Sequence, residues 1–210
     1  MVSSSGASSR LGNVDDSDGE SHCDFNVAQW SWSGDNRYNA SGPLSYFASE
    51  RPVLDVFLER FLDTFSPEVD SSWGAGAQRA AAEIRMFSPM ISGALEASSL
   101  AFFGRSTRDP RIEALGIRRC TPVLRTLQEA LRDPEQSRAA STLATVMLLL
   151  TFEIIEQTSQ EAMTAHALGA ARLLHYRGAE NHMYGIEHIL FTETRLFWVS
   201  FPSILLARGK

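Results

Sequence analysis

The stretch from Ser137 to Gln157, SRAASTLATVMLLLTFEIIEQ, decides the fold class. If it forms a helix, apolar residues cover most of the circumference, which is typical of a helix buried among other helices. Its uncharged part, residues 139–152, is shorter than the roughly 18–20 residues that a membrane span requires. We therefore expect a central buried helix surrounded by further helices.

Two helices are expected well before this stretch. From Val53 to Phe65, apolar residues recur at spacings of three and four, which predicts an amphipathic helix. The pair Ser66-Pro67 should end that helix, because the residue before a proline avoids the helical conformation. Residues 78–87 are rich in alanine and are also expected to be helical.

Start signals mark the two helices that follow. Ser88-Pro89 and Asp109-Pro110 each combine a side chain that caps a helix with a proline suited to the first turn. The first of these helices is expected to run through Phe103 and to end at Gly104. The second should be kinked or split by Pro122, because proline removes one hydrogen bond inside a helix.

After the central stretch, Thr158 or Ser159 should cap a helix that runs through Tyr176 and stops at Gly178. A last helix is expected from about residue 184 to 206, bent by Pro202. No segment alternates apolar and polar residues between hairpin turns, so strands are not expected. The sequence thus predicts an all-α array of antiparallel helical hairpins with six or seven helices.

Residues 1–43 differ from the rest in composition. Residues 1–50 contain seven acidic and two basic residues, so they account for −5 of the net charge of −6. Such a polar, acidic segment is expected to be a disordered tail, followed by an all-α domain over residues 44–210. Phe25, Trp30 and Trp32 interrupt the tail and suggest a docking segment for another protein, or aromatic residues that pack back on the domain.

The sequence offers little support for catalysis, metal binding or DNA contact. The two cysteines exclude a disulfide framework and a cysteine-rich zinc site, and no histidine pair has the spacing of a helical zinc site. No region shows the excess of lysine and arginine typical of a nucleic-acid surface. Arg118 and Arg119 could lower the pKa of Cys120, although a buried packing role is the alternative. We expect no enzyme activity, no metal and no cofactor.

A sequence pattern near the C-terminus gives the first indication of a protein family. It consists of a leucine-rich helix ending in glutamate, a helix with His-x-x-Gly-Ala followed by two leucines and Arg-Gly, and then Leu-Phe and arginine. Its members after the leucine-rich helix are His166, Gly169, Ala170, Leu173, Leu174, Arg177, Gly178, Leu190, Phe191 and Arg195. This pattern resembles the fungal-specific transcription factor regulatory domain of the second type, which occurs behind Zn2Cys6 binuclear-cluster DNA-binding modules. The resemblance covers residues 53–210.

The motif also has a physical interpretation. Gly169 within a helix costs about 1 kcal/mol relative to alanine, so close approach of a neighbouring helix should compensate. On that basis Gly169→Leu should disrupt folding. His166 shares a face with Gly169 and is expected to bridge helices, or alternatively to contact an effector. Arg177 and Gly178 fit the end of a helix, where a cation and a glycine are favoured.

The chain also departs from the family, because it lacks the six-cysteine cluster and its basic neighbours. The resemblance implies a nuclear regulatory protein that acts through a protein partner or a small-molecule effector, without contacting DNA through this chain. Cytoplasmic location is the alternative. We expect the domain to be incomplete at its C-terminal end, where the apolar residues 196–201 favour self-association. The competing hypotheses are a helical scaffold unrelated to transcription and an enzyme with a site inside a helical bundle.

Overall fold

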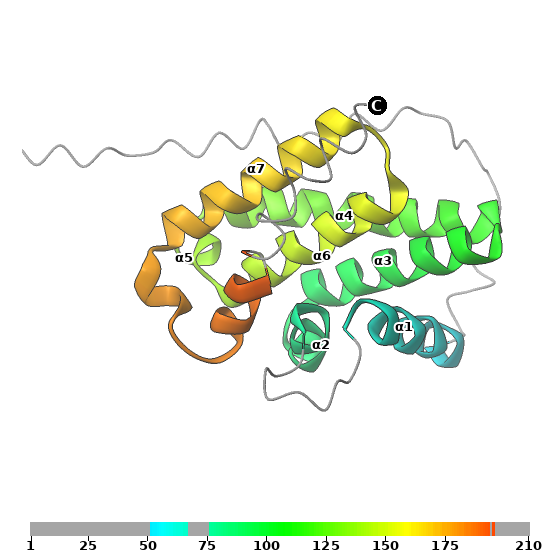
Figure 1. Ribbon diagram of the computed structural model, residues 1–210, viewed down its shortest axis with the longest axis horizontal. Coiled ribbons are helices and arrows are strands. Elements are labelled where there is room, and N and C mark those ends of the chain that lie inside the picture. Colours follow the sequence, from blue (N-terminus) through cyan, green and yellow to red (C-terminus); the bar gives the residue numbers. More distant parts are fainter. Residues whose placement is uncertain (1–50, 67–75, 194, 196–210) are drawn as a thin grey trace, which may run out of the picture.

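The computed structural model describes residues 51–66, 76–193 and 195 of the chain (Figure 1). In chain order the elements are α1 (Arg51–Phe65), α2 (Ala77–Glu83), the 3-10 helix η3 (Arg85–Phe87), α3 (Pro89–Thr107), α4 (Pro110–Arg132), α5 (Pro134–Ser137), α6 (Ala140–Glu156), α7 (Gln160–Arg177) and the 3-10 helix η4 (Ala179–His182). A further helical segment covers residues 185–193. No strand occurs among the described residues, which confirms the predicted all-α class.

Some expectations concern parts of the chain outside the described residues. These are the tail over residues 1–43 with its docking residues Phe25, Trp30 and Trp32, and the region after residue 195 with Pro202 and the apolar stretch 196–201. Within the described residues, no helix is long and apolar enough to cross a lipid bilayer.

Helix α6 lies at the centre of the fold, as the apolar stretch predicted. Every residue from Thr142 to Glu156 except Ile154 is buried. The helix contacts α2, α3, α4, α5 and α7, so other elements cover it on most sides (Figure 1). It begins at Ala140, three residues later than the quoted stretch, because the short helix α5 occupies the positions before it. The all-round apolar character of α6 therefore reflects its contacts with five neighbours.

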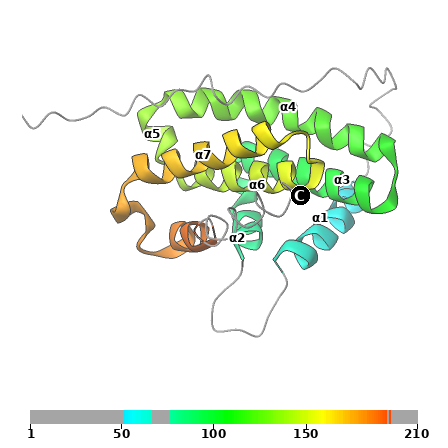
Figure 2. The same ribbon diagram turned by 45° about the horizontal axis from the view of Figure 1, so that its top comes forward.

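Helices α3 and α4 form a tight antiparallel hairpin (Figure 2). The expected end of α3 at Gly104 is wrong, because the helix continues to Thr107 and Arg108 takes the left-handed conformation with φ 57°. Gly104 instead allows α4 to approach, since a Cβ atom there would lie 2.5 Å from the backbone nitrogen of Glu113. Gly116 has the same role, because its Cβ would lie 2.8 Å from the nitrogen of Ala101.

Helix α4 is not split at Pro122. It runs without interruption from Pro110 to Arg132. Pro122 is exposed, so the hydrogen bond that proline cannot make is lost on the solvent side. Val123 and Leu124, which follow directly, are buried and hold the second half of the helix against the core. Packing therefore keeps the helix continuous across its proline.

The predicted start signals are confirmed as caps. The Ser88 side chain accepts a hydrogen bond from the N–H of Ile91 at 3.4 Å, and the Asp109 side chain accepts one from Arg111 at 2.9 Å. Ser159, rather than Thr158, caps α7. The predicted helix over residues 78–87 is correct only in part, because the α-helix ends at Glu83 and the chain continues as the 3-10 helix η3.

Aromatic rings attach α1 to α3 at the edge of the fold. The rings of Phe57 and Phe103 stack with their centroids 3.9 Å apart. Phe102 meets Phe61 and Phe65 edge to face, with centroid distances of 6.4 and 5.3 Å. Such pairs add about 0.5–1.5 kcal/mol to the burial of the rings. The amphipathic face predicted for residues 53–65 therefore packs on α3.

Candidate functional site

The residues of the family-like motif lie on two parts of the molecule. His166 faces α4 and α6 from the first half of α7, whereas Arg177 and Gly178 lie at the far end of the same helix. Eleven residues of helix separate His166 from Arg177, which is about 16 Å. Leu190 is fully buried, Phe191 is half-buried and Arg195 is exposed. The motif therefore does not form a single site.

Its apolar members face the interior. Ala170 and Leu173 are fully buried in the main core together with Leu190, and Leu174 packs against that core. Gly169 is also buried. The close helix approach expected at Gly169 stays a prediction, whereas Gly104 and Gly116 show such approaches between α3 and α4.

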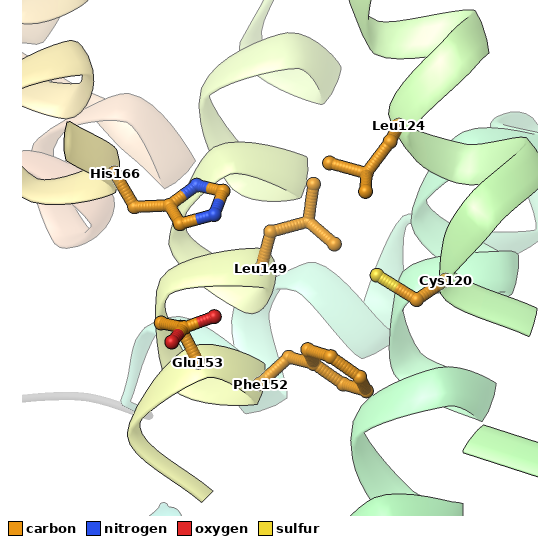
Figure 3. A pocket seen from close by; sticks show the side chains of 6 residues that line it. All are labelled: Cys120, Leu124, Leu149, Phe152, Glu153 and His166. Atoms are coloured by element: carbon orange, nitrogen blue, oxygen red, sulfur yellow. The ribbon is translucent and has the colours of Figure 1, made fainter. Parts of the chain in front are cut away.

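The first candidate site is a pocket between α4, α6 and α7, called the His166 pocket below. Its lining residues are Cys120 and Leu124 from α4, Leu149, Phe152 and Glu153 from α6, and His166 from α7 (Figure 3). The empty space is about 200 Å³ and includes some open solvent. Because open solvent counts toward that figure, the enclosed space is well below the roughly 300–1,000 Å³ of sites for drug-sized ligands. The pocket is therefore small for an organic effector.

The thiol of Cys120 is not an activated nucleophile. Burial raises its pKa to about 12, and the negative charges of Glu153 and Glu156 add to this effect. The predicted lowering of the thiol pKa by Arg118 and Arg119 is thus wrong, because the net shift is upward and neither arginine is among its causes. Arg119 points instead to Glu96, with Nε and Oε2 3.6 Å apart. Cys120 is buried, as the packing alternative predicted.

His166 and Glu153 face the same pocket, and burial disfavours the charged form of each. Burial lowers the pKa of His166 to about 4, so its imidazole is neutral at pH 7. Burial also raises the pKa of Glu153. A carboxyl oxygen of Glu153 accepts hydrogen bonds from the N–H of Thr158, at 3.2 Å, and from its hydroxyl. Glu153 thus closes the turn between α6 and α7.

The Cys–His–Glu combination in this pocket was not found from the sequence. Its members lie on three helices, 33 and 13 positions apart along the chain, so no local motif connects them. The protonated thiol of Cys120 lacks the thiolate that nucleophilic catalysis needs, and Leu149 lies between it and His166 (Figure 3). Among the described residues, no cluster of three or more histidine, cysteine or acidic side chains is arranged to hold a metal ion.

The second candidate site is the corner where α7 ends, called the Arg177 corner below. Arg177 is a buried residue, only 2% exposed. It donates to the carbonyl of Arg138, between α5 and α6, and to the carbonyl of Asn181 at 3.4 Å. The side-chain amide of Asn181 donates in return to the carbonyl of Arg177. Arg177 therefore links the end of α7 to the start of α6, in addition to the expected favourable position at the helix end.

Two further features shape this corner. Gly178 has φ 78°, a conformation that disfavours other residues, as expected for the end of a helix. His182 is buried, with Nε2 3.4 Å from the carbonyl of Leu174, and its ring stacks on Phe191 with centroids 5.2 Å apart. Nδ1 of His188 lies 3.1 Å from the carbonyl of His182. These contacts join η4 and the segment 185–193 to α7.

No family model, no curated protein and no solved structure matches this chain. The functional interpretation therefore depends on the residues of the motif and on where the fold places them. At both candidate sites their side chains are buried between helices: His166 within the first half of α7, and Arg177 with its partners at the end of the same helix. Both arrangements favour a role in joining helices.

Proposed function

We propose that the chain is a transcription-factor-like regulatory domain, similar to the fungal-specific type, that acts by binding a partner. DNA contact by this domain is not part of the proposal. The observation that carries it is the Arg177 corner. There the Arg-Gly and Leu-Phe parts of the motif, separated by a loop in the sequence, form one structural unit. The buried arginine, the glycine with positive φ and the stacked phenylalanine give these letters of the motif structural roles, which supports the proposal.

A protein partner fits the geometry better than a small effector does. The His166 pocket is small, and its Cys120 thiol and His166 imidazole are uncharged at pH 7. By contrast, η3 carries two neighbouring large apolar side chains that are exposed to solvent. Met86 is 79% exposed and Phe87 is 81% exposed. Exposed methionine and aromatic side chains are enriched in protein interfaces.

The same exposed pair also favours the alternative, a helical scaffold unrelated to transcription. Nothing in the geometry of η3 requires the partner to belong to the transcription machinery. The two functions differ in location and in effect on a promoter. The resemblance implies a nuclear protein, whereas a scaffold needs no presence in the nucleus.

A tethering experiment tests the proposal. The full chain is fused to an unrelated DNA-binding domain in a fungal reporter strain, and transcription of the reporter is measured. We expect a change of at least about threefold in either direction. The double variant Met86→Ser with Phe87→Ser should lose most of that effect, because it removes the exposed pair without touching the core.

Val56→Ser is the matched control, because Val56 is also apolar and 64% exposed but lies on α1. This variant should behave as the wild type does. An unchanged reporter with every fusion, together with exclusion of the untethered chain from the nucleus, would reject the transcriptional proposal and favour the scaffold. Loss of the reporter effect in Val56→Ser as well would show that η3 is not the specific contact.

A further inference from the structure

Helix α4 has a line of arginines along one face. The line repeats every seven residues and consists of Arg111, Arg118, Arg125 and Arg132. Seven residues correspond to about 10 Å of helix, and each such step turns the side chain by only about 20° around the axis. Because α4 runs without interruption from Pro110 to Arg132, the four arginines form one stripe about 30 Å long, called the arginine stripe below.

The arginine stripe lies on the solvent side of α4. Arg111, Arg125 and Arg132 are exposed, and Arg118 is half-buried. The opposite side of the helix, with buried residues such as Leu127, packs on α3 and α6. Helix α4 also lies at the outer edge of the fold in Figure 2. The stripe is therefore accessible to a binding partner.

The positive charge of the stripe is not neutralised by the described residues. Ion pairs in this part of the chain involve other arginines, in the pairs Arg79–Asp63, Arg105–Glu113 and Arg119–Glu96. Glu129 is exposed on the same face, and no ion pair joins it to Arg125 or Arg132 in the structure. Four arginines and one glutamate give this face a net charge of +3.

Such a stripe fits an acidic segment in an extended conformation. The planar guanidinium group matches a carboxylate with two parallel hydrogen bonds, and it is more weakly hydrated than the ammonium group of lysine. An extended chain advances about 3.3 Å per residue, so three of its residues match the spacing of about 10 Å between successive arginines. About ten extended residues would therefore follow the whole stripe.

The N-terminal part of this chain contains a segment of that length and charge. Residues 15–24, DDSDGESHCD, include five acidic residues, and no lysine or arginine occurs between Arg10 and Arg37. Ten extended residues span about 33–36 Å, close to the length of the stripe. These residues lie outside the part of the chain that the structure describes.

The fold brings this part of the chain to the start of the stripe. Phe57, in the first half of α1, stacks on Phe103 near the end of α3. Helix α1 therefore begins at the side of the fold where α3 turns into α4, and Arg111 lies directly after that turn (Figure 1). Residues 25–50 connect the acidic segment to α1 and can span up to about 90 Å. The segment can thus reach every part of the stripe.

We propose that the arginine stripe of α4 binds the acidic residues 15–24 of the same chain. Charge and length favour this occupant, and a tethered segment also binds at a higher effective concentration than a free one. The contact covers the outer face of α4 from within the molecule. An acidic partner must then displace residues 15–24 before it binds to α4. This inference does not depend on the proposed transcriptional function.

The test uses Cys23, which lies inside the acidic segment, as the attachment point for a nitroxide spin label. Cys120 is buried, so it stays unlabelled in the folded chain. The label broadens the NMR signals of backbone amides that lie close to it. At low salt we expect amides along α4 to lose most of their intensity, whereas those of α2 keep theirs. The loss should disappear at 1 M salt, where the Debye length is about 3 Å.

The double variant Arg118→Gln with Arg125→Gln removes two charges from the middle of the stripe. Its matched control is Arg60→Gln with Arg85→Gln, which also removes one exposed and one half-buried arginine, from α1 and η3. Broadening of α4 should be lost in the stripe variant and kept in the control. Equal broadening in the two variants, or none in the wild type at low salt, would overturn the proposal.

Two outcomes would overturn the proposal by identifying another occupant. In a mixture, isotope-labelled chains without a nitroxide are combined with unlabelled chains that carry it. Broadening of α4 in this mixture as strong as within one chain would assign the stripe to a second copy. If the nitroxide leaves α4 unaffected while a short DNA duplex binds the wild type but not the stripe variant, the stripe binds nucleic acid instead.

Discussion

The α3–α4 and α6–α7 hairpins have the same topology but differ in how their helices are held together. Between α3 and α4 the backbones come into direct contact at small residues, namely Gly104 of α3 and Gly116 of α4. Between α6 and α7 the contact includes buried polar groups, namely Glu153 and His166, which line the same pocket. Arg177 adds another at the end of α7.

The α3–α4 hairpin is thus held by close packing of its two backbones, whereas the α6–α7 hairpin also depends on buried polar groups. Close backbone contact contains no group that titrates near pH 7, so the α3–α4 hairpin should respond to volume changes and hardly to pH. Buried polar groups cost desolvation free energy that a purely apolar interface avoids. Proteins tend to retain buried polar groups at functional sites, despite their cost in stability. The α6–α7 hairpin is therefore the half in which we expect motion.

The largest effect is expected for Gly116→Ala in α4. Alanine normally stabilises a helix by about 1 kcal/mol relative to glycine. Here the new Cβ would lie 2.8 Å from the nitrogen and 3.2 Å from the Cα of Ala101, so the helices must move apart. We expect a loss of about 3 kcal/mol in the free energy of unfolding, measured by urea denaturation.

Gly169→Ala in α7 is the matched variant for the other hairpin. If α7 is held by polar groups and not by close backbone contact, alanine should be tolerated there or should stabilise by up to about 1 kcal/mol. A loss as large as that of Gly116→Ala would show that Gly169 also permits a close approach, and the contrast between the hairpins would fail.

Arg177→Met should have the next largest effect. Methionine can fill much of the space of the arginine stem but leaves the carbonyls of Arg138 and Asn181 without their buried donor. We expect a loss of about 2–3 kcal/mol. Arg172→Met, at an exposed position on the same helix, should change stability by at most about 0.5 kcal/mol. Equal losses in the two variants would argue that the Arg177 corner does not hold α7.

Helix starts were predictable from the sequence, whereas one helix end was not. The side chains of Ser88, Asp109 and Ser159 accept hydrogen bonds from backbone N–H groups two or three residues away. Such caps can be recognised from the neighbouring sequence alone. Gly104 looks like a helix end but serves a contact with Glu113, on the next helix. A glycine that ends a helix and one that admits a neighbour are identical in the sequence, and only the packing distinguishes them.

The candidate sites were predictable only in part, for a similar reason. The motif directed attention to His166 and Arg177, and both are indeed buried. Their partners could not be inferred, because Cys120 precedes His166 by 46 positions and the Arg138 carbonyl precedes Arg177 by 39. Glu156 gave no signal at all, since a glutamate at the end of an apolar helix is normally solvated. It is nevertheless buried, and its backbone carbonyl accepts a hydrogen bond from Arg105 of α3.

His166→Gln tests whether the α6–α7 hairpin responds to acid. Burial lowers the pKa of His166 to about 4, below the ordinary value near 6.5, so the unfolded chain binds the proton more readily. The stability from the neutral imidazole is therefore complete above about pH 6.5 and is lost as the pH falls toward 4. We expect the wild type to lose about 2 kcal/mol relative to His166→Gln over this range.

The measurement is the urea midpoint of both proteins at several values of pH, and only their difference is interpreted. That difference cancels the opposite contribution of Glu156, whose raised pKa lowers stability as the pH rises from about 4.5 to 7. His175→Gln is the control, because His175 is exposed on α7. If the His175→Gln and His166→Gln profiles coincide, burial of His166 has no energetic consequence.

The smallest effects are expected for two serine residues that cap helices, one in each hairpin. Ser159 accepts from the N–H of Ala162 at 3.0 Å, and Ser88 accepts from the N–H of Ile91 at 3.4 Å. Replacing Ser159 by alanine should cost about 1 kcal/mol, and the longer bond of Ser88 should make Ser88→Ala cost about half as much.

The two losses of stability should also affect different parts of the molecule. If α7 opens without the rest of the chain, Ser159→Ala speeds amide exchange in α7 and leaves α3 and α4 protected, whereas Ser88→Ala lowers the protection of the slowest amides throughout. Uniform loss of protection in both variants would mean that the two hairpins unfold as one unit. The polar contacts of α7 would then break only when the backbone contacts of α3 and α4 also break.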